Sequence, residues 1–397
     1  MDLVVFLDHR FWKHPDGTIW TKTVHGYSYW QRYLEVFPRV RVVSRVIALA
    51  ASDEGSGSLA ERVDGPGVTV QSLGDYVGQL QVVLAARRST ALIDDVLRGR
   101  PAVIVRASSH TGYLASRVLL ARRMAFGVEV VNDPDELFAA GRHGTWLSPL
   151  IRIAMTRNTR RLCRSAVSVS YVSRTVLPVK YPASRSAFVT SYSSVELADD
   201  AFVGNGSLER YFRRNPELVT VASLDQPLKG VDILIRAVAV CAAAGMPVTL
   251  TVVGDGRLRS IYERLAADLG ISRVVRFPGA VPGPIRVREF LDRATLFVLA
   301  SRSEGLPRVV IEAMARGLPC ICTDVGAVRE VLAAAWLVPP QDSGALGRRI
   351  VAALSSQREL ARAAATNLLR ARTFRASELQ ARRIEFCKAL AESSRQG

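Results

Sequence analysis

The chain has 397 residues, of which 49% are hydrophobic and 22% charged, and a formal net charge of +17 at pH 7. This composition excludes a disordered or fibrous protein, and the length favours two domains with a binding cleft between them. The excess of basic residues indicates an anionic partner such as nucleic acid, acidic lipid or a phosphorylated substrate, although high-GC coding would enrich arginine equally well.

The N-terminal segment does not have the features of a secretory signal. Residues 3–7 form a short apolar run directly after Asp2, so we expect them to be the first strand. No segment approaches the roughly 20 apolar residues of a membrane-spanning helix. The five cysteines lack metal-type spacing and are interpreted as reduced core thiols. Together these features predict a cytoplasmic protein.

Apolar runs alternate with amphipathic stretches along the first half of the chain. Such alternation is typical of a parallel sheet flanked by helices. A helix is expected at residues 112–125 and a loop at residues 8–18, bordering the cleft. The predicted strands cover residues 3–7, 40–48, 68–70, 102–105, 128–131 and 167–172.

The apolar periodicity lapses around residues 203–216 and then restarts, which indicates a domain boundary. The second half is predicted to be another doubly wound α/β unit. Its expected strands are 218–222, 248–253, 274–277, 296–300 and 319–323, and its helices 230–244, 258–269, 286–293 and 308–317.

The predicted fold class is therefore α/β, with two facing Rossmann-like domains and a cleft between them. We expect an N-terminal acceptor domain at residues 1–205 and a C-terminal donor domain at residues 206–375. A last helix within residues 376–397 is expected to pack back on the N-terminal domain.

Residues 296–317, LFVLASRSEGLPRVVIEAMARG, are the most informative segment. A strand there leads into an amphipathic helix, and open α/β sheets bind ligands at the carboxyl ends of their strands. Pro307 is predicted to be the first helical residue. The backbone amides of Leu306 and Arg308 then offer an anion site, and Gly305 allows close approach of a ligand.

Two carboxylates, Glu304 and Glu312, frame this predicted anion site, with seven residues between them. Carboxylates repel phosphate, so we expect them to accept hydrogen bonds from hydroxyl groups on either side of a diphosphate. A nucleotide sugar has this chemistry. In isolation, a capping acid followed by a solvated helix charge would be the more common explanation.

The segment EGLPRVVIEAMARGLP closely resembles the motif of two glutamates seven residues apart in GT-B glycosyltransferases of family 4, also called group 1. The resemblance implies that Glu304 contacts the donor sugar and Glu312 the ribose. It extends through VASLDQPLKGVDILIRAV, VTLTVVGDG, VVRFPGAV and TDVGAVREVL, in the order of the family.

The same resemblance places Lys229 on the donor phosphates. A second basic position of the family is occupied here by Ser223, so that contact is either a hydroxyl contact or replaced, for example by Arg308. The resemblance also places Val281 near the nucleobase of the donor. The family also implies retention of anomeric configuration, catalysis without a metal or other cofactor, and a leaving phosphate that helps to deprotonate the acceptor.

The first domain resembles the family less closely. Asn132 and Asp133 follow a predicted strand where family members often carry a histidine that faces the acceptor. Either Asp133 takes that polar role, as a catalytic residue, or the role is absent; Asp133 would then cap a helix. With Asp135 it also forms a D-x-D sequence, a metal-binding pattern in another glycosyltransferase fold. His110, in a loop after a buried strand, is a second candidate for the acceptor side.

A basic helix is predicted around residues 146–164, with apolar positions at Leu147, Leu150, Ile151 and Ala154. Its apolar face either belongs to the core or lies on an anionic membrane surface. The second alternative would make the protein peripheral on the inner membrane face.

The leading hypothesis is a retaining hexosyl transfer from a nucleotide-sugar donor to a lipid-linked or glycan acceptor, as in bacterial surface polysaccharide synthesis. The alternative is a GT-B partner subunit without activity. A nicotinamide-dependent dehydrogenase is disfavoured, because the sequence after Gly254 and Gly256 has Arg259 where a third glycine is needed. No recognition motif supports a nucleic-acid partner.

Overall fold

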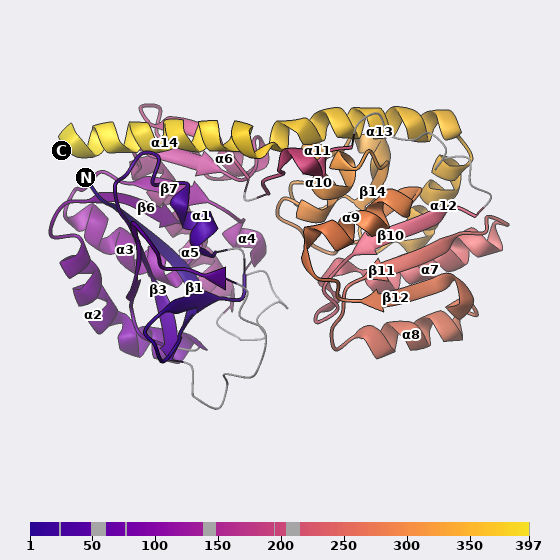
Figure 1. Cartoon of the computed structure of the whole chain (residues 1–397), viewed down its shortest axis with the longest axis horizontal. Coiled ribbons are helices and arrows are strands. Elements are labelled where there is room, and N and C mark those ends of the chain that lie inside the picture. The colour runs from indigo at the N-terminus through magenta and orange to yellow at the C-terminus, as the bar shows by residue number, and fades with distance from the viewer. Residues whose placement is uncertain are drawn as a thin grey trace. The chain divides into compact units, whose positions relative to one another are not determined.

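The computed structural model describes residues 1–23, 25–48, 61–75, 78–137, 148–193, 195–203 and 215–396. Two compact units make up the chain. Unit 1 consists of Met1–Ser194 with Gln380–Gly397, and unit 2 consists of Val195–Leu379. Each unit has its own sheet (Figure 1). Each also has its own hydrophobic cores. Most of the predicted linker, residues 204–214, lies outside the described residues, and the predicted domain bounds stay predictions.

Unit 1 contains a parallel sheet in which the first strand lies in the middle. From one edge to the other the parallel strands are β5 (Val68–Ser72), β3 (Val40–Ala48), β1 (Leu3–Lys13), β6 (Ala102–Arg106), β7 (Gly127–Val130), β8 (Ser168–Tyr171) and β9 (Phe188–Ser191). Two short antiparallel strands, β2 (Ile19–Thr21) and β4 (Glu61–Arg62), follow the far end of β1.

Strand β1 is longer than the sequence predicts. Residues 8–13 are predicted as loop because they are largely polar, but after an irregularity beyond Phe6 the strand continues, and Arg10 to Lys13 pair with Arg45 to Ala48. Trp12 and Lys13 also pair with β2. The backbone hydrogen bonds of two neighbouring strands thus maintain the extended conformation, and the loop prediction is wrong for these residues.

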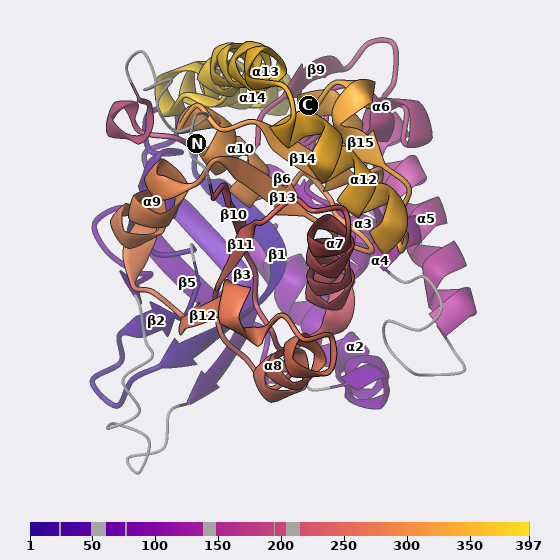
Figure 2. The same ribbon diagram turned by 90° about the vertical axis from the view of Figure 1, so that its right-hand side faces the viewer.

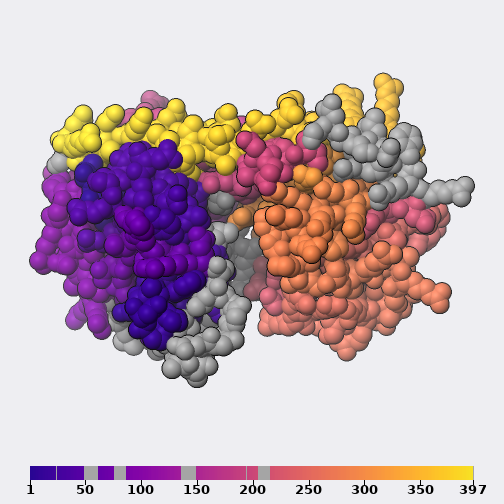
Figure 3. Space-filling view, viewed as in Figure 1, coloured from indigo at the N-terminus to yellow at the C-terminus, as the bar shows by residue number. Residues whose placement is uncertain are grey.

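Helices cover both faces of the unit 1 sheet. Val4, Phe6 and Val105 belong to a core that is closed by helices including α3 and α5. The opposite face is covered by α14: a side chain at Gly127 would lie 2.8 Å from the ring of Phe386. Figure 3 shows this helix, in yellow, over the N-terminal residues of the unit. The helices are α1 (Tyr27–Gln31), α2 (Gly78–Val96), α3 (His110–Ala121), α4 (Pro134–Leu137), α5 (Ser148–Ser165), α6 (Val176–Lys180) and α14 (Ala376–Gln396), the last beginning in unit 2.

Unit 2 contains six parallel strands with the same type of order. They are β12 (Val275–Gly279), β11 (Thr249–Val253), β10 (Glu217–Val221), β13 (Leu296–Leu299), β14 (Cys320–Thr323) and β15 (Leu337–Val338). The chain moves outward from β10 to β12, and then returns to place β13 on the other side of β10. The strand order therefore reverses between β10 and β13.

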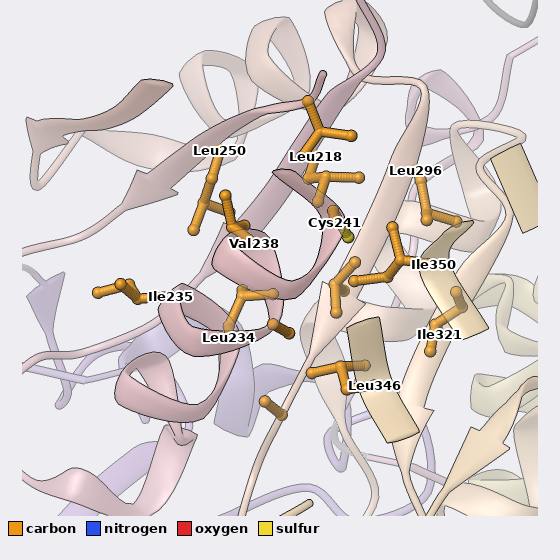
Figure 4. Close-up of a cluster of buried hydrophobic side chains, with 14 of the residues drawn as sticks. Leu218, Leu234, Ile235, Val238, Cys241, Leu250, Leu296, Ile321, Leu346 and Ile350 are labelled. Carbon is orange, nitrogen blue, oxygen red and sulfur yellow. The ribbon is translucent and has the colours of Figure 1, made fainter. Parts of the chain in front are cut away.

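Alternating strand residues in unit 2 enter two cores on opposite faces of the sheet. Leu218 and Leu296 face α7 and α12 in the core of Figure 4, whereas Phe297 belongs to the core beneath α10. The helices α7 and α12 pack side by side (Figure 2), because Gly347 lets α12 approach Val240 closely. The helices are α7 (Val231–Ala243), α8 (Arg259–Asp268), α9 (Gly283–Arg293), α10 (Arg308–Ala315), α11 (Val328–Val331), α12 (Ser343–Leu354) and α13 (Gln357–Ala371).

Short 3₁₀ turns join several of these elements. They are η2 (Asp199–Ala201), η4 (Pro227–Lys229), η5 (Ser272–Val274), η6 (Ala334–Trp336) and η7 (Arg372–Phe374). Within the described ranges, no helix is long and apolar enough to cross a membrane. All five cysteines are buried with free thiols.

Candidate donor site

The loops that follow β10 and β13 meet where the strand order of unit 2 reverses, which is the usual ligand position in open α/β sheets. Lys229, at the end of η4, donates from Nζ to Glu304 Oε1 at 2.6 Å. Ser301 Oγ donates to the same oxygen at 2.6 Å. The structure thus brings together two residues that the sequence predicts for the donor, one from each loop.

Arg302 connects the two loops behind this pair. Its backbone amide donates to Leu228 O at 2.8 Å, and its guanidinium binds both carboxylate oxygens of Asp232 at 2.9 and 2.6 Å. Thr323 on β14 donates to Ser301 O at 2.6 Å. Lys229 and Glu304 are therefore held by bonds that do not involve their own side chains.

Two glycines permit the close approach of the loops. A Cβ at Gly230 would lie 1.9 Å from Ala300 O, and a Cβ at Gly326 would lie 1.8 Å from Glu304 O. Both have positive φ, +61° and +56°, which glycine adopts without strain. No other residue type fits at either position without moving the loop that carries Glu304.

Glu312 lies on α10 and is half-buried. Burial raises the pKa of its carboxyl group above the ordinary value, and the charges of Arg308 and Arg288 offset part of this effect. Within the described part of the chain, no hydrogen bond or ion pair to another side chain engages this carboxylate. Its oxygens can therefore accept hydrogen bonds from a ligand.

The start of α10 differs by one residue from the prediction. Pro307 has extended ψ and is the N-cap, so Arg308 is the first helical residue. The first amides of any helix have no acceptor within it, and they favour an anion. Gly305 and Arg308 are exposed beside this helix start, whereas Leu306 packs against the core beneath α10.

Ser223, the predicted substitute for a basic residue, is exposed after β10 and donates to Asp225 Oδ2 at 3.1 Å. Arg257 donates from Nε to Asp225 O at 2.6 Å. A cation therefore lies against the loop of Ser223, although it comes from the loop after β11. Val281 is half-buried and packs against the core beneath α10.

Sequence reasoning missed the residues that position the pair: Ser301, Arg302, Asp232 and Gly326. Ser301 and Arg302 lie in the same segment as Glu304, and Gly326 lies in the quoted TDVGAVREVL. Their roles depend on contacts with distant segments, such as Asp232, which is 70 residues from Arg302. The sequence indicates only one of these residues: Gly326 is a glycine in a loop at the carboxyl end of a predicted strand.

Asp133, the predicted acceptor-side residue, lies in unit 1 and is buried. Its carboxylate accepts hydrogen bonds from Lys180 Nζ, from Tyr181 Oη and from the amide of Asp135. These bonds position the start of α4, and the catalytic role of Asp133 stays a prediction. Within the described ranges, no three histidine, cysteine or carboxylate side chains form a group that could hold a metal ion.

Comparison with known proteins finds a family match within unit 2. Residues 215–356 match the model of the family described as glycosyl transferases group 1. Protein CapJ of Staphylococcus aureus is 21% identical over 80% of this chain and 78% of its own length. The amylovoran biosynthesis glycosyltransferase AmsK of Erwinia amylovora is 29% identical over 32% of this chain and 33% of its own length.

The solved structures extend the likeness to the whole chain. HepE of Anabaena, in complex with UDP, has a TM-score of 0.67 at 16% identity and covers 97% of this chain and 99% of its own. Another structure of HepE, in complex with UDP-glucose, has a TM-score of 0.63 at 16% identity and covers 99% and 100% of the two chains. The predicted GT-B fold is confirmed, and the predicted resemblance to group 1 glycosyltransferases is confirmed over residues 215–356.

Proposed function

We propose that this chain transfers a hexosyl group, with retention of configuration, from a nucleotide-sugar donor to a lipid-linked or glycan acceptor. The observation that carries the proposal is the meeting of Lys229 and Glu304 at the strand-order reversal of unit 2. Glu312, whose carboxylate is open to a ligand, adds a second acceptor of hydrogen bonds on α10.

Each side chain has a defined task in this proposal. The Lys229 ammonium group stabilises the negative charge that develops on the leaving diphosphate, together with the amides at the start of α10. Glu304 accepts hydrogen bonds from the sugar hydroxyls and Glu312 from the ribose. Because these groups supply the positive charge at the phosphates, the proposed reaction needs no metal ion.

The donor and the biological product are proposed from relatives. HepE has been crystallised with UDP and with UDP-glucose, which supports a nucleotide sugar as the donor. AmsK is named for amylovoran biosynthesis. We propose that this chain also acts in the synthesis of a bacterial polysaccharide.

The basic helix α5 supports a peripheral membrane location for this reaction. Its core face includes Met155 and Leu162, whereas Leu150 and Ile153 are 62% and 44% exposed. Five arginines, Arg152, Arg157, Arg160, Arg161 and Arg164, lie on the same helix. Leu147, predicted to share the apolar face, lies outside the described residues. Exposed apolar side chains among arginines fit a surface of acidic lipids.

The donor part is tested by thermal shift of the purified chain with UDP-, GDP-, ADP- and dTDP-sugars. One nucleotide class should stabilise the protein, and Lys229→Ala and Glu312→Ala should abolish that response. Glu263→Gln, an exposed position on α8, is the matched control. If no donor shifts the melting temperature, the chain is instead a GT-B partner subunit without activity.

The membrane part is tested by sedimentation with vesicles of acidic or neutral phospholipid at low salt. The wild-type chain should sediment with the acidic vesicles only, and the double variant Leu150→Ser and Ile153→Ser should remain in the supernatant. Equal sedimentation of the variant and the wild type would contradict a role for α5.

The stereochemistry and the metal dependence of the transfer are tested together. NMR of the anomeric proton of the product, in a reaction that contains EDTA, tests retention of configuration and independence from metal ions.

A further inference from the structure

The sheet of unit 1 also reverses its strand order, between β1 and β6, and a pocket lies at that position. The pocket has a volume of about 370 Å³. It is lined by residues of β1 and β3 and by those at the carboxyl ends of β6 and β7; the polar ones include Asp8, Arg45, Arg106, Ser108, His110 and Asn132. Open α/β sheets bind ligands at such reversals, so this pocket has the position expected of a ligand site.

Two arginines give the pocket a positive character. Arg45 pairs with Asp8 at 2.8 Å, and Arg106 lies 3.3 Å from Glu129 Oε2. Glu129 does not line the pocket, and Asp8 is the one carboxylate residue that does, within the described residues. Burial, followed by the charges of Arg106 and Arg45, lowers the pKa of His9 in the pocket wall to about 4. A further positive charge in the pocket wall, such as a protonated His9, is therefore unfavourable.

Two polar atoms in this wall, Oγ of Ser108 and Oδ1 of Asn132, are buried without a hydrogen-bond partner, as far as the described residues show. Nε of Arg106 also makes no hydrogen bond and has its ion pair with Glu129 in place of one. Arg106 is only 7% exposed. Buried polar groups are costly without partners, and their presence around one hollow indicates a ligand that completes their bonding.

The loop after β6 has further features of a binding loop. Ser108 has φ +69°, which is strained for a residue with a Cβ, and such strain is concentrated at functional sites. The 12-residue helix α3 begins at His110, directly after this loop. Its N-terminus adds a partial positive charge at the pocket. Charge and helix direction thus agree on a negatively charged ligand, and the unused polar atoms favour one that also carries hydroxyl groups.

We propose that this pocket binds the acidic group of the acceptor, a carboxylate or phosphate carried by a sugar. The inference rests on the proposed transferase function, because it assigns the acceptor to unit 1. Arg45, Arg106 and the start of α3 bind the oxyanion, and Ser108 and Asn132 bind neighbouring hydroxyls. Asn132 thereby has a role at a position where a histidine is frequent in the family.

The test is saturation-transfer NMR on the full chain with glucuronate, glucose 6-phosphate and glucose, each measured in competition and alone. At least one acidic sugar should bind about tenfold more tightly than glucose, because it gains charge-assisted hydrogen bonds. Arg45→Gln and Asn132→Asp should each remove most of this preference. Arg41→Gln, an exposed position on the same strand β3, should leave it unchanged.

The results also show whether the acidic group is a carboxylate or a phosphate. They further separate the pocket assignment from the proposed transferase function. Preference for glucuronate assigns a carboxylate, and preference for glucose 6-phosphate assigns a phosphate. Equal binding of all three sugars, or an acid preference that survives both variants, would overturn the inference. Binding of UDP-, GDP-, ADP- and dTDP-sugars is measured on the same samples: absence of binding to all four with a retained acid preference would contradict the proposed transferase but leave the pocket assignment intact. Melting curves of both variants verify that they are folded.

Discussion

The two strand-order reversals of this chain have the same topology but are built differently. In unit 2 the pair of Lys229 and Glu304 lies on loops, and the Lys229 side chain is 32% exposed. In unit 1 the pair of Arg106 and Glu129 comes from strands, and its side chains are 8% and 3% exposed. Glu129 also accepts hydrogen bonds from Tyr33 and Tyr192, at 2.8 Å each.

This difference separates two uses of charge. The pair in unit 2 can exchange its mutual contact for contacts with a ligand, because solvent already reaches the lysine. The pair in unit 1 is part of the core, and removal of one partner leaves the other charge buried. We therefore expect removal of Glu129 to affect mainly stability and removal of the Glu304 charge to affect mainly activity.

The largest expected effect is on the stability of unit 1. Glu129→Gln leaves the buried Arg106 without a counter-charge and should lower the free energy of unfolding by about 3–5 kcal/mol. Urea unfolding followed by circular dichroism measures it. Asp94→Asn, which breaks the exposed pair with Arg122, should cost less than about 1 kcal/mol. Equal losses in the two variants would contradict the proposed difference.

The next effect is on activity in unit 2. Glu304→Gln keeps the shape of the side chain but removes its charge, and turnover should fall by roughly 10²- to 10³-fold, as for other preorganised electrostatic contacts. The melting temperature should change little, since Lys229 is partly solvated. Initial rates with the preferred donor measure this, with Glu263→Gln as the control. A large loss of stability with unchanged turnover would refute the assignment.

A smaller effect is expected from the backbone that carries Glu304. Gly326→Ala places a Cβ against Glu304 O and should cost about 1–3 kcal/mol through strain, with weaker donor binding. Gly245→Ala is a matched control, because its φ is +72° but no atom lies within 4 Å of the added Cβ. Both variants should lose stability on thermal unfolding, but only Gly326→Ala should lose the donor response.

The smallest effect concerns the pH dependence of stability. Burial raises the pKa of Glu312 above its ordinary 4.5, so the folded state binds this proton more tightly than the unfolded state. Stability is therefore lost as the pH rises through the raised pKa. Glu312→Gln should stabilise the ligand-free protein slightly at pH 7 but not at pH 4, while donor binding weakens. A variant that is destabilised at pH 7 would exclude this explanation.

The fold of unit 2 could be predicted well from its sequence because its strands are mainly apolar runs between helical patterns. Glu304 and Glu312 could also be predicted as candidate donor-site residues, because their motif is continuous in sequence. Arg302 and Gly326 could not be assigned, because their contacts lie on Asp232 and on the Glu304 backbone. The roles of the predicted site residues stay predictions.

Unit 1 shows the limit of the same reasoning. Polar residues after Leu7 indicated a loop, but pairing with β3 keeps β1 extended to Lys13. The pocket is assembled from five separate segments of the chain, residues 7–9, 25, 45, 106–110 and 131–132. His110 could be considered from sequence, whereas Arg45 lies within a predicted strand, residues 40–48, and gave no signal.

The helix α14 has a consequence for the biosynthesis of the chain. Unit 2 is one continuous segment, but unit 1 includes residues 380–396, where Gln380 bonds to Arg32 and Phe386 packs over Gly127. During translation, the sheet of unit 1 is synthesised before residues 380–396. The face that α14 covers therefore stays exposed until these residues have emerged from the ribosome. The unit that is synthesised first is the last to be completed.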